Sequence, residues 1–497
     1  MAKKLVIIGG GVAGLSAGIF AQINGFDSVI LEKNHVLGGE CTGWDRKGYH
    51  IDGCIHWLVG TKENTPMNKL WKTLGALDGV DVYHPETFLT FEHEQGTVHL
   101  YRDLERLKKS WIEMSSDDKE VIEEFCADIK KLHSFDIPTG KPMDLMTIVE
   151  KVKAMISMKE AGMIVNKYGK ITLNEFSDRF KHPALRDALG TFLPKGYNAM
   201  PIFFALATYT KGDASIPVGG SRTMSKNMEK RYVELGGIVE NSCEVSDLKI
   251  DGKNVRQIET KDGRRFSGDY YLAACDARFV YENLLKGRYN DTKYETRFND
   301  PVNYPLASNI YVSLGYGGSM EGIPRSVRFP LKKPITINDK ELAHLMMTHY
   351  KYEPTFSPEG NNVITCAINQ FHSDVDAWKT IAVSTEQYKK EKERIGNEVR
   401  QSIESRYPEM TGKLEVLDVA TPITYEKYCN AHRGSFMGFL PTVKGKSLNH
   451  TGRIKGLDNL YLTGQWLQPP GGLPTAAITG KDTVMRICWK ERQEFRY

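Results

Sequence analysis

The chain has 497 residues, of which 40% are hydrophobic and 26% charged. This length exceeds the roughly 250–300 residues at which a single hydrophobic core stops growing, so we expect two domains. The composition is that of a folded globular protein and excludes a disordered one. Lysine and arginine number 66 and aspartate and glutamate 62, a net charge of +4. The basic residues are scattered, which argues against nucleic acid as a partner.

The first residues, MAKKLVIIGG, enter a strand-like apolar run within four positions. They leave no room for the charged region, apolar segment and cleavage site of a signal peptide. No run approaches the 18 apolar residues that indicate a membrane-spanning helix. We therefore expect a cytoplasmic protein, with membrane contact only of a peripheral kind.

The cysteines are far apart in the sequence. No CxxC and no paired Cys/His spacing of the kind a zinc site needs is present. We expect reduced structural thiols and no metal site. The eight positions are Cys41, Cys54, Cys126, Cys243, Cys275, Cys366, Cys429 and Cys488.

The N-terminal segment has the order of a βαβ unit. Leu5–Ile8 is a short continuous apolar run, as expected for a strand buried on both faces of a parallel sheet. Val12–Ile23 has apolar residues at helical spacing and small residues that allow close packing. Ser28–Leu31 predicts a second strand, which ends at Glu32.

Between the first strand and the helix, Gly9, Gly11 and Gly14 stand in GxGxxG spacing. They follow a strand, open a helix and precede Glu32 by about twenty positions, which together match the dinucleotide-binding fingerprint. The first glycine makes the tight turn, the second lets backbone N–H groups approach a pyrophosphate, and the third lets helix and strand pack closely. The helix N-terminus adds partial positive charge. Glu32 can bind both ribose hydroxyls and would repel a 2′-phosphate, which favours FAD or NAD over NADP.

The segment after Glu32 departs from a simple nicotinamide domain, in which a helix usually follows. It is polar and punctuated by glycines, beginning with Gly38-Gly39. Such a loop can place a second stretch of backbone along an extended ligand. This favours a permanently bound cofactor.

The C-terminal segment predicts a strand, Asn459–Thr463, and a helix from about Thr475 to Trp489. Gly464-Gln465 and Pro469–Pro474 lie between them. The glycines permit close backbone approach to a flat ring, and a helix N-terminus would stabilise negative charge on a reduced flavin. Considered alone, the segment is equally compatible with an ordinary terminal strand and helix.

These two segments resemble the opening and closing motifs of the flavin amine oxidase and phytoene desaturase superfamily. A third element of that superfamily lies between them, from Pro217–Ser221 through a helix to about Leu235 and on to Asp276. The resemblance implies FAD as cofactor, with the backbone of Val245 against the adenine. The fingerprint and the resemblance together predict these cofactor-binding residues: Gly9, Gly11, Val12, Ala13, Gly14, Glu32, Lys33, Gly38, Gly39, Val245, Gly464, Gln465, Gly472, Leu473 and Thr475.

Within the superfamily, the chain is most similar to the carotenoid desaturase, carotenoid isomerase and retinol saturase branch. Asp52–Trp57 resembles the pattern in which a His-aromatic pair follows Asp-Gly, which makes His56 the candidate catalytic residue. Thr421–Tyr425 resembles the passage before the closing motif. Two positions depart from the pattern: Glu40 stands where an arginine is often found, and the closing motif contains Pro469-Pro470.

We therefore expect an α/β fold with a Rossmann-like FAD-binding domain, whose sheet is doubly wound and mostly parallel, and a discontinuous α+β substrate-binding domain. The FAD-binding domain is predicted to comprise residues 1–79, 214–289 and 421–497, and the substrate-binding domain residues 80–213 and 290–420. No second GxGxxG opens a helix, and no CxxxxC redox pair is present. This argues against a disulfide reductase and leaves the electron donor or acceptor unidentified.

The predicted substrate-binding domain contains two apolar helices. Pro142–Val165 has apolar residues at helical spacing with several methionines and interspersed lysines. It is compatible with a core helix and with one that dips into a membrane or lines a tunnel mouth. Met200–Tyr209 predicts a helix lining an apolar cavity, and strands at Ala307–Leu314 and Val363–Asn369 predict the sheet of its floor.

The expected function is that of an FAD-dependent oxidoreductase acting on C–C or C=C bonds of a hydrophobic polyene or isoprenoid-like substrate. Hydride transfer at the flavin N5 would give desaturation, saturation or isomerisation, and few side chains need be catalytic. An amine or amino-acid oxidase of the same fold is the alternative, because fold alone does not fix the substrate. A non-catalytic flavin-binding or lipid-binding protein is a second alternative.

Overall fold

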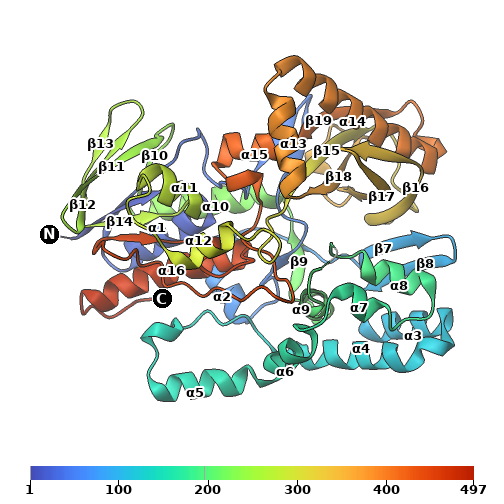
Figure 1. Cartoon of the computed structure of the whole chain (residues 1–497), viewed down its shortest axis with the longest axis horizontal. Helices are drawn as coiled ribbons and strands as arrows, with labels where there is room; N and C mark the ends of the chain where they lie inside the picture. The colour runs from blue at the N-terminus through green and yellow to red at the C-terminus, as the bar shows by residue number, and fades with distance from the viewer. Residues whose placement is uncertain (1, 195) are drawn as a thin grey trace.

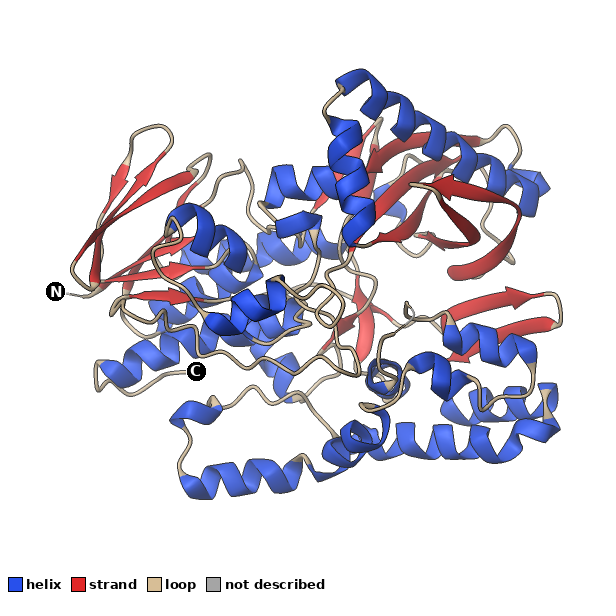
Figure 2. Ribbon diagram, in the orientation of Figure 1, coloured by secondary structure: helices blue, strands red, loops and turns tan. Residues whose placement is uncertain are grey.

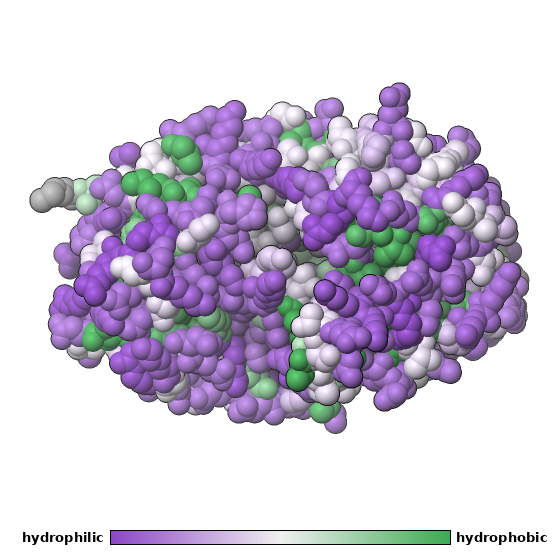
Figure 3. Space-filling view, turned by 90° about the horizontal axis from the view of Figure 1, so that it is seen from above, coloured by the Kyte–Doolittle hydropathy of each residue, from purple (hydrophilic) through white to green (hydrophobic). Residues whose placement is uncertain are grey.

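The computed structural model describes residues 2–194 and 196–497. Its strands form two principal sheets, one of five and one of seven strands, with helices packed against both (Figures 1 and 2). No helix in these two stretches is long and apolar enough to cross a membrane. Seen from above, the surface is mostly hydrophilic, with apolar groups gathered near a central recess (Figure 3).

The five-stranded sheet is parallel throughout, as the sequence predicts. Residues at odd and even positions of its first strand enter different cores: Leu5 and Ile7 pack on one face, and Val6 and Ile8 on the other. Burial of both faces explains why this strand is a continuous apolar run. In spatial order the strands are β10 (Ile238–Glu240), β2 (Asp27–Leu31), β1 (Lys4–Ile8), β14 (Tyr270–Ala273) and β20 (Leu460–Leu462).

The two faces of this sheet are covered differently. One face packs against α1 (Val12–Ile23), α10 (Gly220–Glu234) and α16 (Leu473–Lys490). The other face packs against a three-stranded antiparallel sheet of β11 (Val245–Asp251), β12 (Asn254–Thr260) and β13 (Arg265–Phe266), with α11 (Ala277–Phe279) and α12 (Thr292–Phe298) nearby. The helix predicted over Val12–Ile23 is confirmed with these bounds.

The seven-stranded sheet is antiparallel except where β16 and β7 pair in parallel. Its apolar face packs against α13 (His372–Ala382) and α14 (Thr385–Arg406), with Trp378, Ile395 and Val399 in the core. The strands predicted near 307–314 and 363–369 are confirmed as β15 and β18. The strand order is β19 (Leu414–Ala420), β15 (Ser308–Tyr316), β18 (Asn362–Gln370), β17 (Lys340–His349), β16 (Ser326–Ile337), β7 (Thr87–His93) and β8 (Gly96–Tyr101).

A group of helices lies beside β7 and β8 (Figure 1). Its core is aromatic: the Tyr168 and Phe203 rings stack with centroids 3.8 Å apart, and Phe125 meets Phe203 edge-on at 5.1 Å. The helix predicted at Met200–Tyr209 is confirmed as α9. The helices are α3 (Leu104–Met114), α4 (Lys119–Lys131), α7 (Leu173–Ser177), α8 (Pro183–Gly190) and α9 (Met200–Thr210).

An arm projects from this group and carries α5 (Ile148–Ser157) and α6 (Lys159–Tyr168) (Figure 1). The sequence suggests one helix over Pro142–Val165, but Thr147 and Glu150 form a capping box that starts α5 at Ile148, and the chain breaks between the two helices at Met158. α5 has no buried residue. The first half of the methionine-rich stretch is therefore not a core helix, whereas α6 buries Ala161 and Ile164 in the core of the helical group.

The segment that leads to the arm, residues 139–144, is bound to α16. The fully buried Lys481 ammonium donates to the carbonyl oxygens of Thr139 and Gly140 at 2.7 and 2.6 Å. Arg486 forms two hydrogen bonds with the Asp144 carboxylate at 2.9 and 2.8 Å. The base of the arm is thus held by charge-assisted contacts to the helix that covers the parallel sheet.

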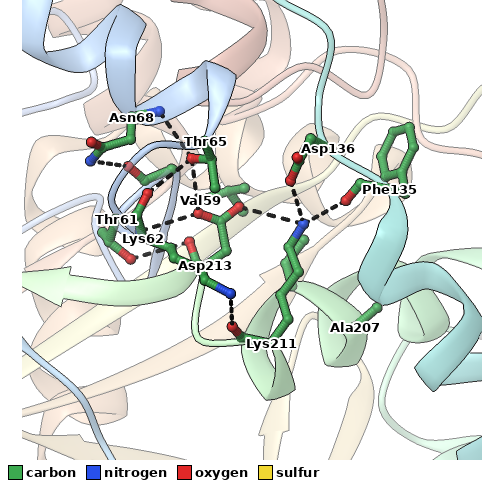
Figure 4. Close-up of polar contacts among 12 residues, drawn as sticks. Val59, Thr61, Lys62, Thr65, Asn68, Phe135, Asp136, Ala207, Lys211 and Asp213 are labelled. Atoms are coloured by element: carbon green, nitrogen blue, oxygen red, sulfur yellow. Dashed lines mark hydrogen bonds and ion pairs between the residues drawn. The ribbon is translucent and has the colours of Figure 1, made fainter. Parts of the chain in front are cut away.

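Short elements link the two principal sheets. β9 (Ala214–Pro217) pairs with β5 (Leu58–Val59) and β6 (Val82–Tyr83), and Asp213 precedes it (Figure 4). The Asp213 carbonyl accepts from Gly60 N at 2.9 Å, and its carboxylate, whose pKa burial raises, accepts from Lys62 N at 3.2 Å. The remaining elements are β3 (Gly43–Arg46), β4 (Tyr49–Asp52), α2 (Pro66–Thr73) and α15 (Pro422–Cys429).

Candidate functional site

The glycine turn after β1 lies beside the loop after β2. Gly38 N donates to the Gly10 carbonyl at 2.9 Å, and Gly11 and Gly38 form a parallel bridge. Gly38 and Gly39 both have positive φ, +123° and +61°, which glycine adopts without steric cost. The structure therefore brings the first two predicted glycine segments together at the N-terminus of α1.

The three fingerprint glycines differ in what surrounds them. A Cβ on Gly14 would lie 2.0 Å from the Gly9 carbonyl oxygen, and one on Gly9 would lie 2.7 Å from that of Ala274. The fold itself therefore requires these two glycines. A Cβ on Gly11 would find its nearest atom at 3.8 Å, and the Gly11 φ of −71° suits any residue. The open space at Gly11 lies where the free N–H groups of α1 begin, so it fits the approach of a pyrophosphate.

Glu32 is buried at the end of β2. Its carboxylate accepts from Gly10 N and Asn34 N, both at 2.8 Å, and from Asn34 Nδ2 at 2.9 Å, which leaves about one of its four lone-pair sites for a ligand. The Glu32 carbonyl accepts from Cys243 N at 2.7 Å, which brings the start of β11, with Val245, alongside. The Lys33 ammonium donates instead to Lys427 O and to the Asn430 side chain, at the end of α15.

The C-terminal motif closes against the same helix. A Cβ on Gly464 would lie 3.6 Å from that of Ala13, and the Ser16 hydroxyl donates to the Ala477 carbonyl at 2.6 Å. Gly472 N donates to the Gln465 side-chain oxygen at 3.2 Å, and a Cβ on Gly472 would meet nothing within 4 Å. Leu473 and Thr475 form the first turn of α16, beside Gly472, and Val12 opens α1, beside Ala13.

Two acidic side chains lie between these segments. Burial is the largest cause that raises the pKa of Glu40 to about 8, and the charge of Asp276 adds to the rise. A hydrogen bond with Gln465 acts in the opposite direction. Burial raises the pKa of Asp276 to about 6, although its carboxylate accepts from Phe279 N and His432 N, both at 3.0 Å. Glu40 is therefore mostly protonated at neutral pH.

Sequence reasoning gave neither acid a role. Glu40 was visible only as a departure from the superfamily pattern. Asp276 follows β14, and ligands of parallel α/β sheets bind outside the carboxyl ends of the strands. This position is the signal that could have singled it out.

Asp52 fixes the loop that carries His56. Its carboxylate accepts from Ser221 N and Ser221 Oγ, both at 2.6 Å, and from Cys54 N at 3.0 Å. A Cβ on Gly220 would lie 1.9 Å from the same carboxylate. The Asp-Gly pair of the sequence motif therefore ties this loop to the N-terminus of α10.

His56 is half-buried beside the seven-stranded sheet. Burial lowers the pKa of its imidazole, Asp52 raises it and the Arg325 charge lowers it further. Its ring centroid lies 6.4 Å from that of Tyr311, whose hydroxyl donates to the Asp52 carbonyl at 2.9 Å. The imidazole is thus held neutral at the junction of the two sheets, where it could accept or donate a proton.

A family model described as flavin containing amine oxidoreductase matches residues 12–488. The chain belongs to this family. It is 21% identical to a 4,4'-diaponeurosporene oxygenase of Staphylococcus haemolyticus over 98% of this chain and 97% of that protein. It is also 21% identical to a chloroplastic prolycopene isomerase of Arabidopsis thaliana, over 97% of this chain and 82% of that protein.

Solved structures share the fold. An oxidoreductase from Methanosarcina mazei is 16% identical and superposes with a TM-score of 0.59, over 97% of this chain and 100% of that one. A putrescine oxidase bound to putrescine is 12% identical with a TM-score of 0.58, over 98% of this chain and 99% of that one. The predicted superfamily, the Rossmann-like α/β fold and FAD as cofactor are confirmed, and this family member is an FAD-dependent oxidoreductase.

FAD supplies the redox chemistry of such a site, as an acceptor or donor of hydride. The chain's own residues prepare the place for it. The glycines leave room at Gly11 and Gly472, and the N-terminus of α1 offers N–H groups to negative charge. Glu40 holds a proton at neutral pH close to Gln465, so it can donate a hydrogen bond where an ionised carboxylate could not.

Proposed function

We propose that this oxidoreductase acts on carbon–carbon bonds of a hydrophobic polyene or isoprenoid-like substrate, by desaturation, saturation or isomerisation. The observation that carries the proposal is an aromatic cluster that begins next to His56 with the exposed Trp57 and continues into the buried rings of Phe88 and Tyr209. Trp57 is 40% exposed and meets Phe88 edge-on at 4.9 Å. Phe88 in turn contacts Tyr209 at 5.0 Å and Phe192 at 6.0 Å. Flat aromatic rings suit a long conjugated chain.

The names of the two relatives support the same substrate class, because diaponeurosporene and prolycopene are both polyenes. Both relatives align with nearly the whole of this chain. We assign Phe88, Phe192 and Tyr209 of the aromatic cluster to a substrate-binding domain of residues 80–213 and 290–420, with Trp57 facing them from the FAD-binding domain. The predicted glycine, Glu32, Val245 and C-terminal residues are assigned to FAD. His56 is the proposed catalytic residue, through proton transfer.

The test of the function is spectroscopic. The purified protein is expected to show the visible absorbance of bound flavin, and after anaerobic reduction a polyene should reoxidise it, or a polyene should bleach the oxidised form. Bleaching of the oxidised flavin by an amine would overturn the proposal in favour of an amine oxidase. A bound flavin that responds to no substrate would favour a non-catalytic flavin-binding protein.

The test of the cofactor site is Gly11→Ala. Since a Cβ there meets no protein atom closer than 3.8 Å, the flavin-free variant should unfold at the same urea concentration as the wild type. FAD affinity should fall by roughly tenfold or more, because the methyl group occupies the space for the pyrophosphate. Gly140→Ala, whose Cβ would also find open space, is the control and should bind FAD normally. Unchanged FAD binding by Gly11→Ala would contradict the assignment.

We further propose that α5 rests on a membrane surface of the cytoplasm. Its apolar side chains are exposed, Ile148 by 82%, Ile156 by 69% and Val149 and Met155 by 63% each. Lys151 and Lys153 lie on the same helix. An amphipathic helix with lysines beside an apolar face binds anionic lipid surfaces by burying that face among the acyl chains.

Vesicle flotation tests this docking. The protein should float with vesicles containing phosphatidylglycerol and less with pure phosphatidylcholine. Val149→Ser combined with Ile156→Ser should abolish flotation without changing stability, because neither side chain is buried. Val383→Ser is the control, since Val383 is 87% exposed at the end of α13. Equal flotation of the double variant, or dimerisation through α5 in place of flotation, would overturn the proposal.

A further inference from the structure

The face of the seven-stranded sheet opposite α13 and α14 carries a row of hydroxyl groups. Ser313 pairs with Thr365, Thr365 with Thr348, and Thr348 with Ser326, so the row crosses β15, β18, β17 and β16 in direct register. All four residues are buried. Neighbouring residues in the same strands, such as Val312 and Met347, point into the apolar core beneath the helices.

This row is only partly satisfied by hydrogen bonds within the fold. The Ser326 and Thr348 hydroxyls lie 3.1 Å apart, and that of Thr365 lies 3.4 Å from the Tyr350 hydroxyl. The Ser313 hydroxyl is buried and has no hydrogen-bond partner within the described stretches. An apolar ligand alone gives no reason for a polar floor, because buried hydroxyls cost free energy that aliphatic side chains would not.

Arg325 lies at the end of the row, next to Ser326. Its carbonyl accepts from His349 N at 2.9 Å, which fixes the backbone. The side chain is half-buried, and its Nε atom is buried with no hydrogen-bond partner. Among residues 2–194 and 196–497, Arg325 takes part in none of the salt bridges or side-chain hydrogen bonds, and of its guanidinium nitrogens Nε is the buried one.

Two nearby arginines have hydrogen-bond acceptors for their guanidinium groups. Arg102 donates to three carbonyl oxygens and stacks on the Tyr209 ring at 4.0 Å. Arg328, two positions after Ser326, donates to the Thr191 carbonyl. Arg325 therefore differs from its neighbours in having donors left over, and a guanidinium presents five of them in a planar fork.

The guanidinium of Arg325 is close to the proposed aromatic cluster. Burial raises the pKa of Tyr209 to about 12, and the charges of Arg102 and then Arg325 oppose this rise. Burial also lowers the pKa of His56, and after the opposing effect of Asp52 the Arg325 charge lowers it further. In register, Val327 pairs with Thr90 of β7, so Arg325 lies beside the Phe88 end of that strand.

We propose that Arg325 binds a carboxylate on the substrate, so that the substrate class is a polyene or isoprenoid chain that ends in a carboxylic acid. A carboxylate accepts two parallel N–H donors of one guanidinium, and the hydroxyl row keeps this end of the site polar. The aromatic cluster, whose exposed member is Trp57, would hold the chain. This inference rests on the proposed function and specifies its substrate.

The experiment compares two ligands with the same chain. All-trans retinoic acid and all-trans retinol are titrated into the flavin-loaded protein, and binding is followed by the change in the flavin spectrum and by tryptophan fluorescence. The wild type should bind the acid roughly ten- to a hundredfold more tightly, the range of a hydrogen bond to a charged group. Arg325→Gln should remove this difference and leave the affinity for retinol unchanged.

Arg400→Gln is the matched control, because Arg400 is a half-buried arginine of α14, on the opposite side of the same sheet, paired with Glu404 at 3.3 Å. It should retain the preference for the acid. Arg325→Gln should also keep the urea midpoint of the wild type, since the guanidinium has no partner to lose. A loss of stability would show that Arg325 serves the fold and would overturn the inference.

The outcomes separate the two proposals. Equal affinity for acid and alcohol in the wild type would overturn the carboxylate site and leave a polyene function standing. Binding of neither retinoids nor β-carotene would overturn both. A third outcome is that an amino acid bleaches the flavin of the wild type but not that of Arg325→Gln. Arg325 would then bind the carboxylate of an amino-acid substrate in place of a polyene, and both proposals as stated would be overturned.

Discussion

The two principal sheets use their faces differently. The parallel sheet of β10, β2, β1, β14 and β20 is apolar on both faces, so its side chains cannot meet a ligand, and everything available for chemistry lies in the loops at its carboxyl edge. The seven-stranded sheet is apolar under α13 and α14, whereas its other face combines a smaller apolar cluster around Tyr311 and Val363 with a row of hydroxyl groups. The first sheet therefore positions ligand-binding backbone, whereas the second contributes a surface of side chains.

Gly14→Ala should have the largest effect on stability. It tests whether backbone packing alone defines the edge of the parallel sheet. The added Cβ would lie 2.0 Å from the Gly9 carbonyl, so α1 and the turn must separate. We expect the free energy of unfolding to fall by at least about 3 kcal/mol. The variant should also lose its bound FAD. Urea unfolding followed by circular dichroism measures the first and the visible spectrum the second. Gly162→Ala, in the interior of α6 with open space at its Cβ, should keep the wild-type stability or raise it by up to about 1 kcal/mol, because alanine has the higher helix propensity.

Asp52→Ala tests the connection between the two sheets. The change leaves Ser221 N, Ser221 Oγ and Cys54 N without their acceptor in a buried place. We expect a loss of about 3 kcal/mol in chemical denaturation. Asp45→Ala removes an exposed carboxylate of the adjoining hairpin, paired with Arg222, and should cost less than about 1 kcal/mol. Similar costs for both variants would refute the assigned role of Asp52.

Glu40→Gln addresses the electrostatics at the carboxyl edge. Because the folded pKa is about 8 and the ordinary value 4.5, the folded protein holds a proton that the unfolded chain has lost. This contribution to stability is complete below about pH 4.5 and is lost as the pH rises through about 8. The flavin-free wild type should therefore lose up to about 1.4 kcal/mol per pH unit between these values. In the variant this part of the pH dependence should be absent from urea midpoints measured at pH 5, 6, 7 and 8; an unchanged slope would show that Glu40 ionises normally.

The smallest effect is expected within the hydroxyl row. Ser313→Ala removes a hydroxyl that has no partner in the described chain, so stability should change by less than about 0.5 kcal/mol or rise slightly. Thr348→Val removes the partner of Ser326 and should cost about 1 kcal/mol. Thermal unfolding of the two variants compares them directly. A large cost for Ser313→Ala would mean that its hydroxyl serves the fold and would weaken the view of this face as a ligand surface.

The parallel sheet could be predicted from sequence because its signals are local. Gly9, Gly11 and Gly14 act within one turn, and the apolar runs around them are long enough to identify the strands. The contact of Ala13 with Gly464 could be expected only from the resemblance, since no local pattern links positions so far apart. The assignments of these residues to FAD, and the domain boundaries, stay predictions until binding is measured.

The second sheet was less predictable, because its function depends on alignment between strands. Ser313, Thr365, Thr348 and Ser326 are unremarkable in sequence, and only the register places them in one row. Arg325 is one of many basic residues, and its lack of a partner is a property of the fold. The sequence predicts an apolar floor from the runs in β15 and β18, and both faces are indeed largely apolar, with Ser313 and Thr365 as polar exceptions. For the exposed arm the sequence allows two interpretations, because a methionine-rich amphipathic pattern suits both core and surface.

The contact between α1 and α16 has a consequence for how the protein is made. Ser16 and Ala477, which join these helices, are 461 positions apart in the chain. At about 5–20 residues per second, roughly 20 to 90 seconds of synthesis separate them. During this time α1 can pack against β1, β2 and α10, but the side that meets α16 has no cover and the nucleotide site lacks its second wall. We therefore expect stable binding of the flavin only after translation reaches α16.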